Sequence, residues 1–102
     1  MNIDMNNPVC AIQATLKYSL SQSIVGDLIL LSDRIYFKTS DGAKLPNFKD
    51  ELLFSDIKNI KMGLTLTGYR IVIMDLDGEP WVFNSINREK GKHFIELYNE
   101  IQ

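Results

Sequence analysis

The hydrophobic period of the chain changes once, within residues 81–101, which read WVFNSINREKGKHFIELYNEI. The first four of these residues are typical of a returning β-strand. Further on, Phe94, Leu97, Tyr98 and Ile101 stand at positions i, i+3, i+4 and i+7, which is the apolar stripe of a helix with one buried face. The stretch therefore predicts a last strand and then one amphipathic helix. Three residues are candidate N-caps of that helix: Asn84, Ser85 and Asn87.

The chain before this stretch keeps a period of two. Ile12, Ala14 and Leu16 fall on one face of the first expected strand, and Gln13 and Thr15 fall on the other. The expected strands span residues 9–18, 25–32, 34–39, 51–55, 57–62, 69–76 and 81–84, with tight hairpin turns at Ser32-Asp33 and Asp77-Gly78 and a long loop over residues 40–50. A helix with a single apolar stripe suits the open end of a bent antiparallel sandwich. We therefore expect a mainly β fold, a β-sandwich or partly open barrel of about seven antiparallel strands capped by the C-terminal helix.

Length and composition fit one globular domain. The chain has 102 residues, of which 45% are hydrophobic and 24% are charged. We expect residues 1–8 to form a flexible lead-in and residues 9–102 to form the domain. The net charge of −2 argues against nucleic acid as a partner, because such proteins need a basic excess to neutralise phosphates. A single cysteine, no apolar run long enough to span a membrane and no signal-peptide pattern favour a cytoplasmic location.

Three segments in order resemble a known family. Residues 26–37 read GDLILLSDRIYF, residues 54–60 read FSDIKNI and residues 81–85 read WVFNS. Together with the terminal helix, they are similar to the GRAM domain, a member of the pleckstrin-homology-like (PH-like) group, over about residues 10–102. The resemblance implies a PH-like fold and a non-catalytic module that binds proteins or lipids.

The loops at the expected rim disfavour an anionic headgroup. Some family members hold phosphoinositides there with several Lys and Arg side chains, but the three corresponding loops of this chain sum to a charge of −4. The leading prediction is therefore a protein partner or a second copy of this chain. Binding of a membrane lipid, an anionic phospholipid or a phosphoinositide, remains the alternative.

The outer face of the first sheet carries the main candidate site, which we call the outer patch. Because Leu28 and Leu30 should face the core, the residues between and after them should face outward. Apolar side chains ringed by cations are typical of a partner-binding or self-association surface. The patch consists of Ile29, Leu31, Tyr36, Lys17, Arg34 and Lys38. Two simpler readings stay open: the lead-in covers the patch, or its members are scattered surface residues. The lipid alternative would use the patch cations Lys17, Arg34 and Lys38.

A second basic cluster is expected from Lys58, Lys61 and Arg70 on adjacent strands. The simpler interpretation is that these cations keep a sheet edge from pairing with another chain. The strand near the terminal helix is also a candidate for adding an extended peptide to the sheet. No residue in the sequence selects one of these interpretations.

The residues offer no catalytic or metal-binding pattern. His93 is the only histidine, and Cys10 falls on the inward face of a strand. The acidic run from Asp75 to Glu79 lacks the downstream glutamate of a calcium loop. Residues 63–68 have the glycine spacing of a phosphate loop but not its Lys-Ser/Thr ending. We therefore expect a protein that is not an enzyme and that has no cofactor and no metal.

Overall fold

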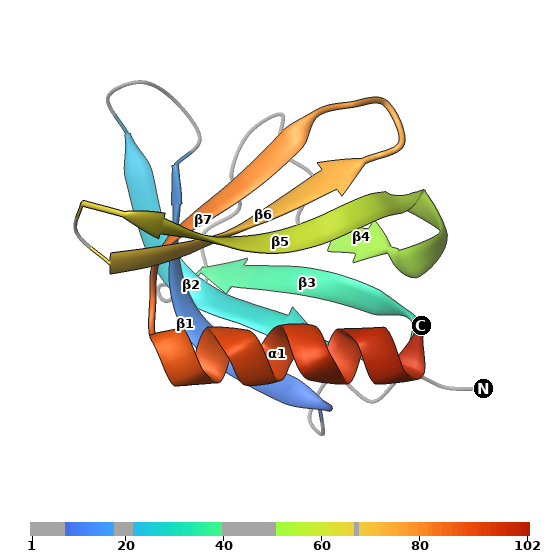
Figure 1. The fold of residues 1–102 in the computed structure, drawn as a ribbon. Coiled ribbons are helices and arrows are strands. Elements are labelled where there is room, and N and C mark those ends of the chain that lie inside the picture. The colour runs from blue at the N-terminus through green and yellow to red at the C-terminus, as the bar shows by residue number, and fades with distance from the viewer. Residues whose placement is uncertain (1–7, 18–21, 40–50, 67) are drawn as a thin grey trace.

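Seven strands and one long helix make up the part of the chain that the computed structural model describes, residues 8–17, 22–39, 51–66 and 68–102. The strands join in one open antiparallel sheet in the order β4-β3-β2-β1-β7-β6-β5 (Figure 1). Their bounds are β1 (Cys10–Lys17), β2 (Ser23–Leu30), β3 (Arg34–Thr39), β4 (Glu51–Leu53), β5 (Ile57–Thr65), β6 (Gly68–Asp75) and β7 (Pro80–Ile86), with a 3₁₀ turn η1 (Phe54–Asp56) and the helix α1 (Arg88–Ile101). The predicted mainly β fold with a terminal helix is confirmed.

The sheet bends so that its two halves enclose one core. Phe37 of β3 and Phe83 of β7 belong to strands that are not neighbours, yet their ring centroids lie 5.6 Å apart. In β1 the predicted inward residues Ile12, Ala14 and Leu16 are all buried, as expected for a strand with one face in the core. Helix α1 packs against β1, β5 and β6, which closes the core on one side (Figure 1).

The helix begins where its sequence predicts. Asn87 is the N-cap, and its side-chain oxygen accepts a hydrogen bond from the Lys90 N–H at 3.0 Å. Phe94 and Tyr98 are buried against the core. The prediction that Ile101 belongs to the buried stripe is wrong, because the face that the helix buries ends one turn earlier, at Tyr98, and Ile101 stays exposed.

Several predicted boundaries shift. The second strand starts at Ser23 instead of Val25 and ends at Leu30, so that it matches β1 over its full length. The predicted strand over residues 51–55 ends at Leu53, and the chain turns through η1 before β5. Gly63 lies inside β5, which continues to Thr65. Residues 1–7 of the expected lead-in, residue 18 of the first expected strand and the long loop over residues 40–50 lie outside the described residues.

The turn between β6 and β7 differs from the predicted two-residue hairpin. The Asp75 N–H donates to the Glu79 carbonyl, and the Gly78 N–H donates to the Asp75 carbonyl, which closes a longer loop. Gly78 has a φ of +84°, a conformation that glycine adopts without strain. The Asp75 carboxylate also accepts from the N–H groups of Asp77 and Glu79, each at 2.9 Å. This side chain stabilises the longer turn from inside.

Candidate functional site

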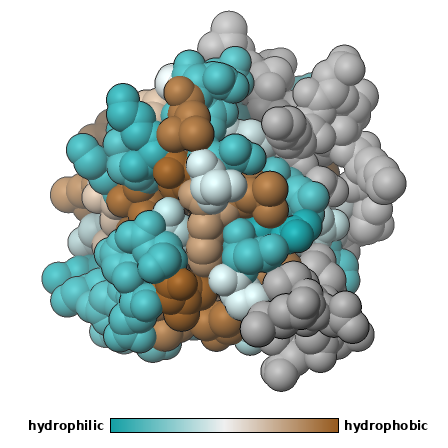
Figure 2. All heavy atoms as spheres, turned by 90° about the vertical axis from the view of Figure 1, so that its right-hand side faces the viewer, coloured by the Kyte–Doolittle hydropathy of each residue, from teal (hydrophilic) through white to brown (hydrophobic). Residues whose placement is uncertain are grey.

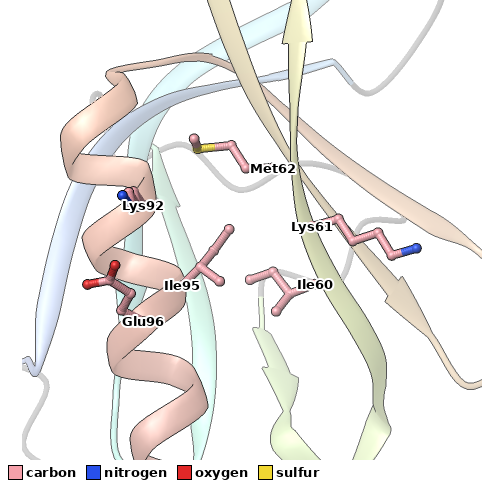
Figure 3. A pocket seen from close by; sticks show the side chains of 6 residues that line it. All are labelled: Ile60, Lys61, Met62, Lys92, Ile95 and Glu96. Atoms are coloured by element: carbon pink, nitrogen blue, oxygen red, sulfur yellow. The ribbon is translucent and has the colours of Figure 1, made fainter.

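A groove runs between strand β5 and helix α1, with a volume of about 450 Å³. Ile60 and Met62 of β5 and Ile95 of α1 point into it, as Figure 3 shows. All three side chains are partly buried and pack against the core. We call this feature the β5–α1 groove; it is lined by Ile60, Lys61, Met62, Lys92, Ile95 and Glu96.

Side chains of β5 point alternately to its two faces, so that one face is apolar and the other is cationic. Because successive side chains of a strand point to opposite faces, Ile60 and Met62 turn toward the helix, and Lys61 turns to the other side (Figure 3). On the helix, Gly91 lets the first turns approach closely: a Cβ there would lie only 3.0 Å from the Met62 sulfur. An apolar groove thus lies beside a strand whose opposite face is cationic.

Strand β5 is one end of the sheet. Among the described strands, β5 pairs with β6 alone, so the side of β5 next to the groove carries no strand from this part of the chain. An edge strand presents a row of backbone N–H and C=O groups that can pair with another chain. The groove therefore combines apolar contacts with main-chain hydrogen-bonding groups.

The outer patch is not the exposed surface that the sequence predicts. Ile29 keeps only 8% of its surface exposed and Leu31 only 2%, so the expectation that both face solvent is wrong. Ile29 sits between Ala11 of β1 and Tyr36 of β3 in the sheet register, and such cross-strand neighbours on one face touch. Burial of the Ile29 and Leu31 side chains is favourable, at roughly 25 cal/mol for each Å² removed from water. The alternative in which the lead-in covers them concerns residues outside the described part.

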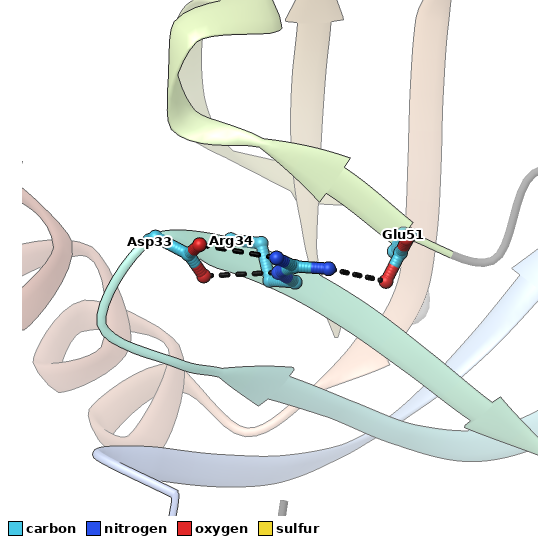
Figure 4. Close-up of polar contacts among 3 residues, drawn as sticks. All are labelled: Asp33, Arg34 and Glu51. Atoms are coloured by element: carbon cyan, nitrogen blue, oxygen red, sulfur yellow. Dashed lines mark hydrogen bonds and ion pairs between the residues drawn. The ribbon is translucent and has the colours of Figure 1, made fainter. Parts of the chain in front are cut away.

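Arg34, one of the patch cations, is held in an ion-pair network (Figure 4). Its Nε and Nη2 donate to the two carboxylate oxygens of Asp33 at 2.9 and 3.1 Å, and its Nη1 donates to Glu51 at 3.1 Å. The hydrogen bonds from Arg34 lower the pKa of Asp33, and those to Asp33 and Glu51 raise the pKa of Arg34. Two carboxylates therefore balance this guanidinium. Lys17 and Lys38 are exposed on the same outer face.

The structure brings two members of the second basic cluster together. In the register of β5 and β6, Gly63 faces Arg70 and Lys61 faces Val72, so Lys61 and Arg70 are diagonal neighbours on one face. A Cβ added to Gly63 would lie 3.5 Å from the Arg70 Nε, so the Arg70 side chain lies across the glycine. Lys58 stands at a break in the register and is exposed.

Acidic side chains gather at the β6–β7 turn. A cavity of about 200 Å³ there is lined by residues that include Glu51, Asp56, Asp75 and Asp77. Asp75 is already used in the fold, because it also accepts from the Trp81 indole N–H at 3.2 Å. In residues 8–17, 22–39, 51–66 and 68–102, no group of three or more His, Cys, Asp or Glu side chains is placed to hold a metal ion.

Cys10 is half-buried, and burial raises the pKa of its thiol, which lowers its thiolate fraction.

The β5–α1 groove is not among the sites that the sequence predicts. One feature of the sequence pointed to the groove: Ile95 follows Phe94 and widens the apolar face of the predicted helix beyond the single stripe. Ile60 and Met62 fall within the strand expected over residues 57–62, and their alternation alone does not show that they border a groove. Which strand ends the sheet depends on pairing between distant segments, so the position of the groove could not be read from local pattern.

Comparisons with known proteins give a fold and no family. A scan against protein-family models found no match, and a search of curated proteins found none either. Among solved structures, the chain is similar to the C-terminal domain of an unknown protein from Leishmania infantum, with a TM-score of 0.69 and 10% sequence identity. The match covers 91% of this chain and 82% of that one. In the described residues no helix is long and apolar enough to cross a membrane.

Proposed function

We propose that this protein is a non-catalytic binding module that holds an extended segment of a partner protein along the free edge of β5, against α1. The observation that carries the proposal is the apolar β5–α1 groove beside a strand that has a neighbour on one side only among the described strands. When a peptide adds to a sheet edge, main-chain hydrogen bonds supply affinity and pockets for alternate side chains supply specificity. The groove offers both.

The two faces of β5 define the chemistry of the partner. A strand added beside β5 would point every second side chain toward Ile60, Met62 and Ile95, which favours aliphatic or aromatic residues. Its other side chains would face the side that carries Lys61 and Arg70, which favours carboxylates. Opposite charges on neighbouring strands are worth roughly 0.2–1 kcal/mol for each pair. The expected partner segment therefore alternates apolar and acidic residues.

The same cations disfavour pairing between two copies of β5. An antiparallel β5–β5 contact would bring Lys58 and Lys61 of one copy close to the equivalent lysines of the other, and like charges in a sheet repel. Lysines at an edge are a common protection against self-pairing. A different protein is thus a better partner for this edge than a second copy of the chain.

Other sequence-based expectations have less support. The outer patch offers less apolar surface than expected, since Ile29 and Leu31 are buried. Arg34, one of the outer-patch cations that would bind a lipid headgroup, is instead ion-paired with Asp33 and Glu51. Membership of the GRAM or PH-like group stays a proposal that the strand number and the terminal helix support. The proposed location is the cytoplasm.

The test uses a defined probe, a blocked ten-residue peptide of alternating valine and glutamate, with a valine–lysine peptide as its charge control. Amide NMR shifts and amide hydrogen exchange are recorded for the intact chain. We expect the acidic peptide to shift and protect amides of β5 and α1, and the basic peptide to bind several-fold more weakly, because each charge pair contributes up to about 1 kcal/mol.

Two variants locate the site. Lys61→Glu should weaken binding of the acidic peptide and strengthen binding of the basic one, whereas Lys38→Glu, which changes another exposed lysine, on β3, should change neither. Protection that falls on β4 instead of β5, or equal effects of the two variants, would remove the proposal.

A further inference from the structure

Two leucines project from the end of the β5–β6 hairpin. Leu64 has 74% of its surface exposed and Leu66 is fully exposed. The last pair of the hairpin is Thr65 and Gly68, where the Thr65 hydroxyl donates to the Gly68 carbonyl at 2.9 Å. We call Leu64 and Leu66 the leucine tip. Single exposed apolar residues are common on proteins, but two leucines at the end of one protruding hairpin form a compact apolar point.

Arg70 lies near the base of the leucine tip, and Arg88 lies at the same end of the molecule. Arg70 faces Gly63, two residue pairs from the end of the hairpin, which is about 7 Å along the strands. Strand β7 runs toward the same end, because its last residue, Ile86, pairs with Tyr69, and α1 starts there with Arg88. The tip and the first turn of the helix lie at the same end of the molecule (Figure 1).

The charge of this end differs from that of the other end. Among the described residues, the start of β6 and the first turns of α1 hold four cations and one carboxylate, a formal charge of +3: Arg70, Arg88, Lys90 and Lys92 against Glu89. The opposite end of the β5–β6 hairpin holds the acidic turn with Asp56, Asp75, Asp77 and Glu79. Figure 2 looks onto that side and shows hydrophilic residues covering much of it, with hydrophobic ones between them.

We infer that the leucine tip docks this protein on the surface of an anionic lipid bilayer, with Leu64 and Leu66 inserted at the headgroup level. Apolar side chains beside Lys and Arg are the pattern of interfacial membrane binding, in which buried apolar area adds to attraction by anionic lipids. A projecting point needs no matching pocket in a fluid bilayer. The acidic turn, repelled by the same lipids, orients the molecule with the tip toward the membrane. This surface differs from the rim loops and from the outer patch that the sequence analysis considered for lipids.

The experiment measures sedimentation of the intact chain with vesicles of phosphatidylcholine alone and of phosphatidylcholine mixed with phosphatidylserine. We expect binding to the anionic vesicles at low salt and its loss in about 1 M salt, where the screening length falls to about 3 Å. The double variant Leu64→Ser/Leu66→Ser should bind at least about tenfold more weakly, because full burial of one leucine alone is worth that factor. Leu76→Ser, which changes a leucine with 63% exposure at the acidic end, should bind as the parent does.

A charge pair of variants completes the test. Arg70→Gln/Arg88→Gln should lower the affinity by about fivefold for each cation removed, whereas Lys38→Gln on β3 should leave it unchanged. Circular dichroism of each variant establishes that the fold is kept. The inference is overturned by absent binding to anionic vesicles at low salt, or by equal losses in the tip variant and in Leu76→Ser. It is also overturned if the parent chain is a dimer that the tip substitutions separate, since the leucines would then serve a second copy.

Discussion

Phe54 meets Tyr98 edge to face, with ring centroids 5.0 Å apart and ring planes at 86°. Phe54 belongs to η1, between β4 and β5, the two strands that end the sheet, and Tyr98 is the last buried residue of α1. The contact therefore joins the helix to the open side of the bent sheet. It also fixes α1 in the position that forms the β5–α1 groove.

This ring contact should be measurable as a coupling energy. We expect the double-mutant cycle of Phe54→Leu and Tyr98→Leu to give about 0.5–1.5 kcal/mol in urea unfolding, the range for aromatic pairs beyond their buried area. The same cycle with Ile101→Ala in place of Tyr98→Leu serves as the control and should show no coupling, because Ile101 is exposed at the helix end.

The N-cap of α1 should contribute on its own. Asn87→Ala removes the acceptor for the Lys90 N–H and should lower the free energy of unfolding by about 1 kcal/mol. Asn99→Ala, an exposed position near the other end of the same helix, should change stability by less than about 0.5 kcal/mol. Similar losses in the two variants would contradict the assignment of Asn87 as the cap.

Two glycines should respond oppositely to alanine. A Cβ at Gly26 would collide with the backbone carbonyl of Lys38 on the neighbouring strand, so Gly26→Ala should cost about 1–3 kcal/mol. At Gly63 the nearest atom is the flexible Arg70 side chain at ordinary contact distance, so Gly63→Ala should be neutral or stabilising by up to about 1 kcal/mol. Thermal unfolding of the two variants measures both effects relative to the parent chain. A destabilised Gly63→Ala would contradict the register of β5 and β6.

Arg34 should control the acid titration of its neighbour. The hydrogen bond from Arg34 holds the pKa of Asp33 below its ordinary value. The contribution of this pair to the stability of the fold is therefore complete above the pKa of Asp33 in the unfolded chain, about 3.9, and is lost as the pH falls through the lower pKa of Asp33 in the folded chain. In Arg34→Gln we expect the Asp33 pKa, followed by carboxyl NMR, to return toward its ordinary value. Lys38→Gln should not move it.

Tyr98 should make the protein sensitive to alkali. Burial raises the pKa of its phenol, so above about pH 10 the unfolded chain loses this proton while the folded chain keeps it. The free energy of unfolding should therefore fall as the pH rises past 10 toward the folded pKa. Tyr98→Phe should remove this part of the decline. Between pH 7 and 9 the stability curves of the two proteins should run parallel, and a Tyr98→Phe curve that still falls as steeply at high pH would contradict the assignment.

Local pattern predicted much of the framework. The inward faces of β1 and β3, the hairpin at Ser32-Asp33 and the amphipathic helix follow from periods of two and 3.6, and these depend only on near neighbours. The turn at Asp75 was missed because one carboxylate binds several backbone N–H groups there, an interaction that a two-residue turn rule does not include.

The surfaces were harder to predict. Alternation correctly places Ile29 on the outer face, yet it says nothing about whether that face is covered. The β5–α1 groove depends on where the sheet ends, and that is set by pairing between segments far apart in the sequence. The exposure of the leucine tip was not predicted, because residue type does not show whether a leucine near a turn is exposed.

The place of β1 at the centre of the sheet has a consequence for how the chain acquires its structure. Thr15 and Leu16 pair with Asn84 and Phe83, near the other end of the sequence. During synthesis β1, β2 and β3 can assemble as a meander, but one side of β1 stays unpaired until β7 has left the ribosome. Such long-range closure slows folding and leaves a nascent strand exposed to aggregation. A chain shortened before β7 should therefore collapse without reaching the native arrangement, however intact its first three strands are.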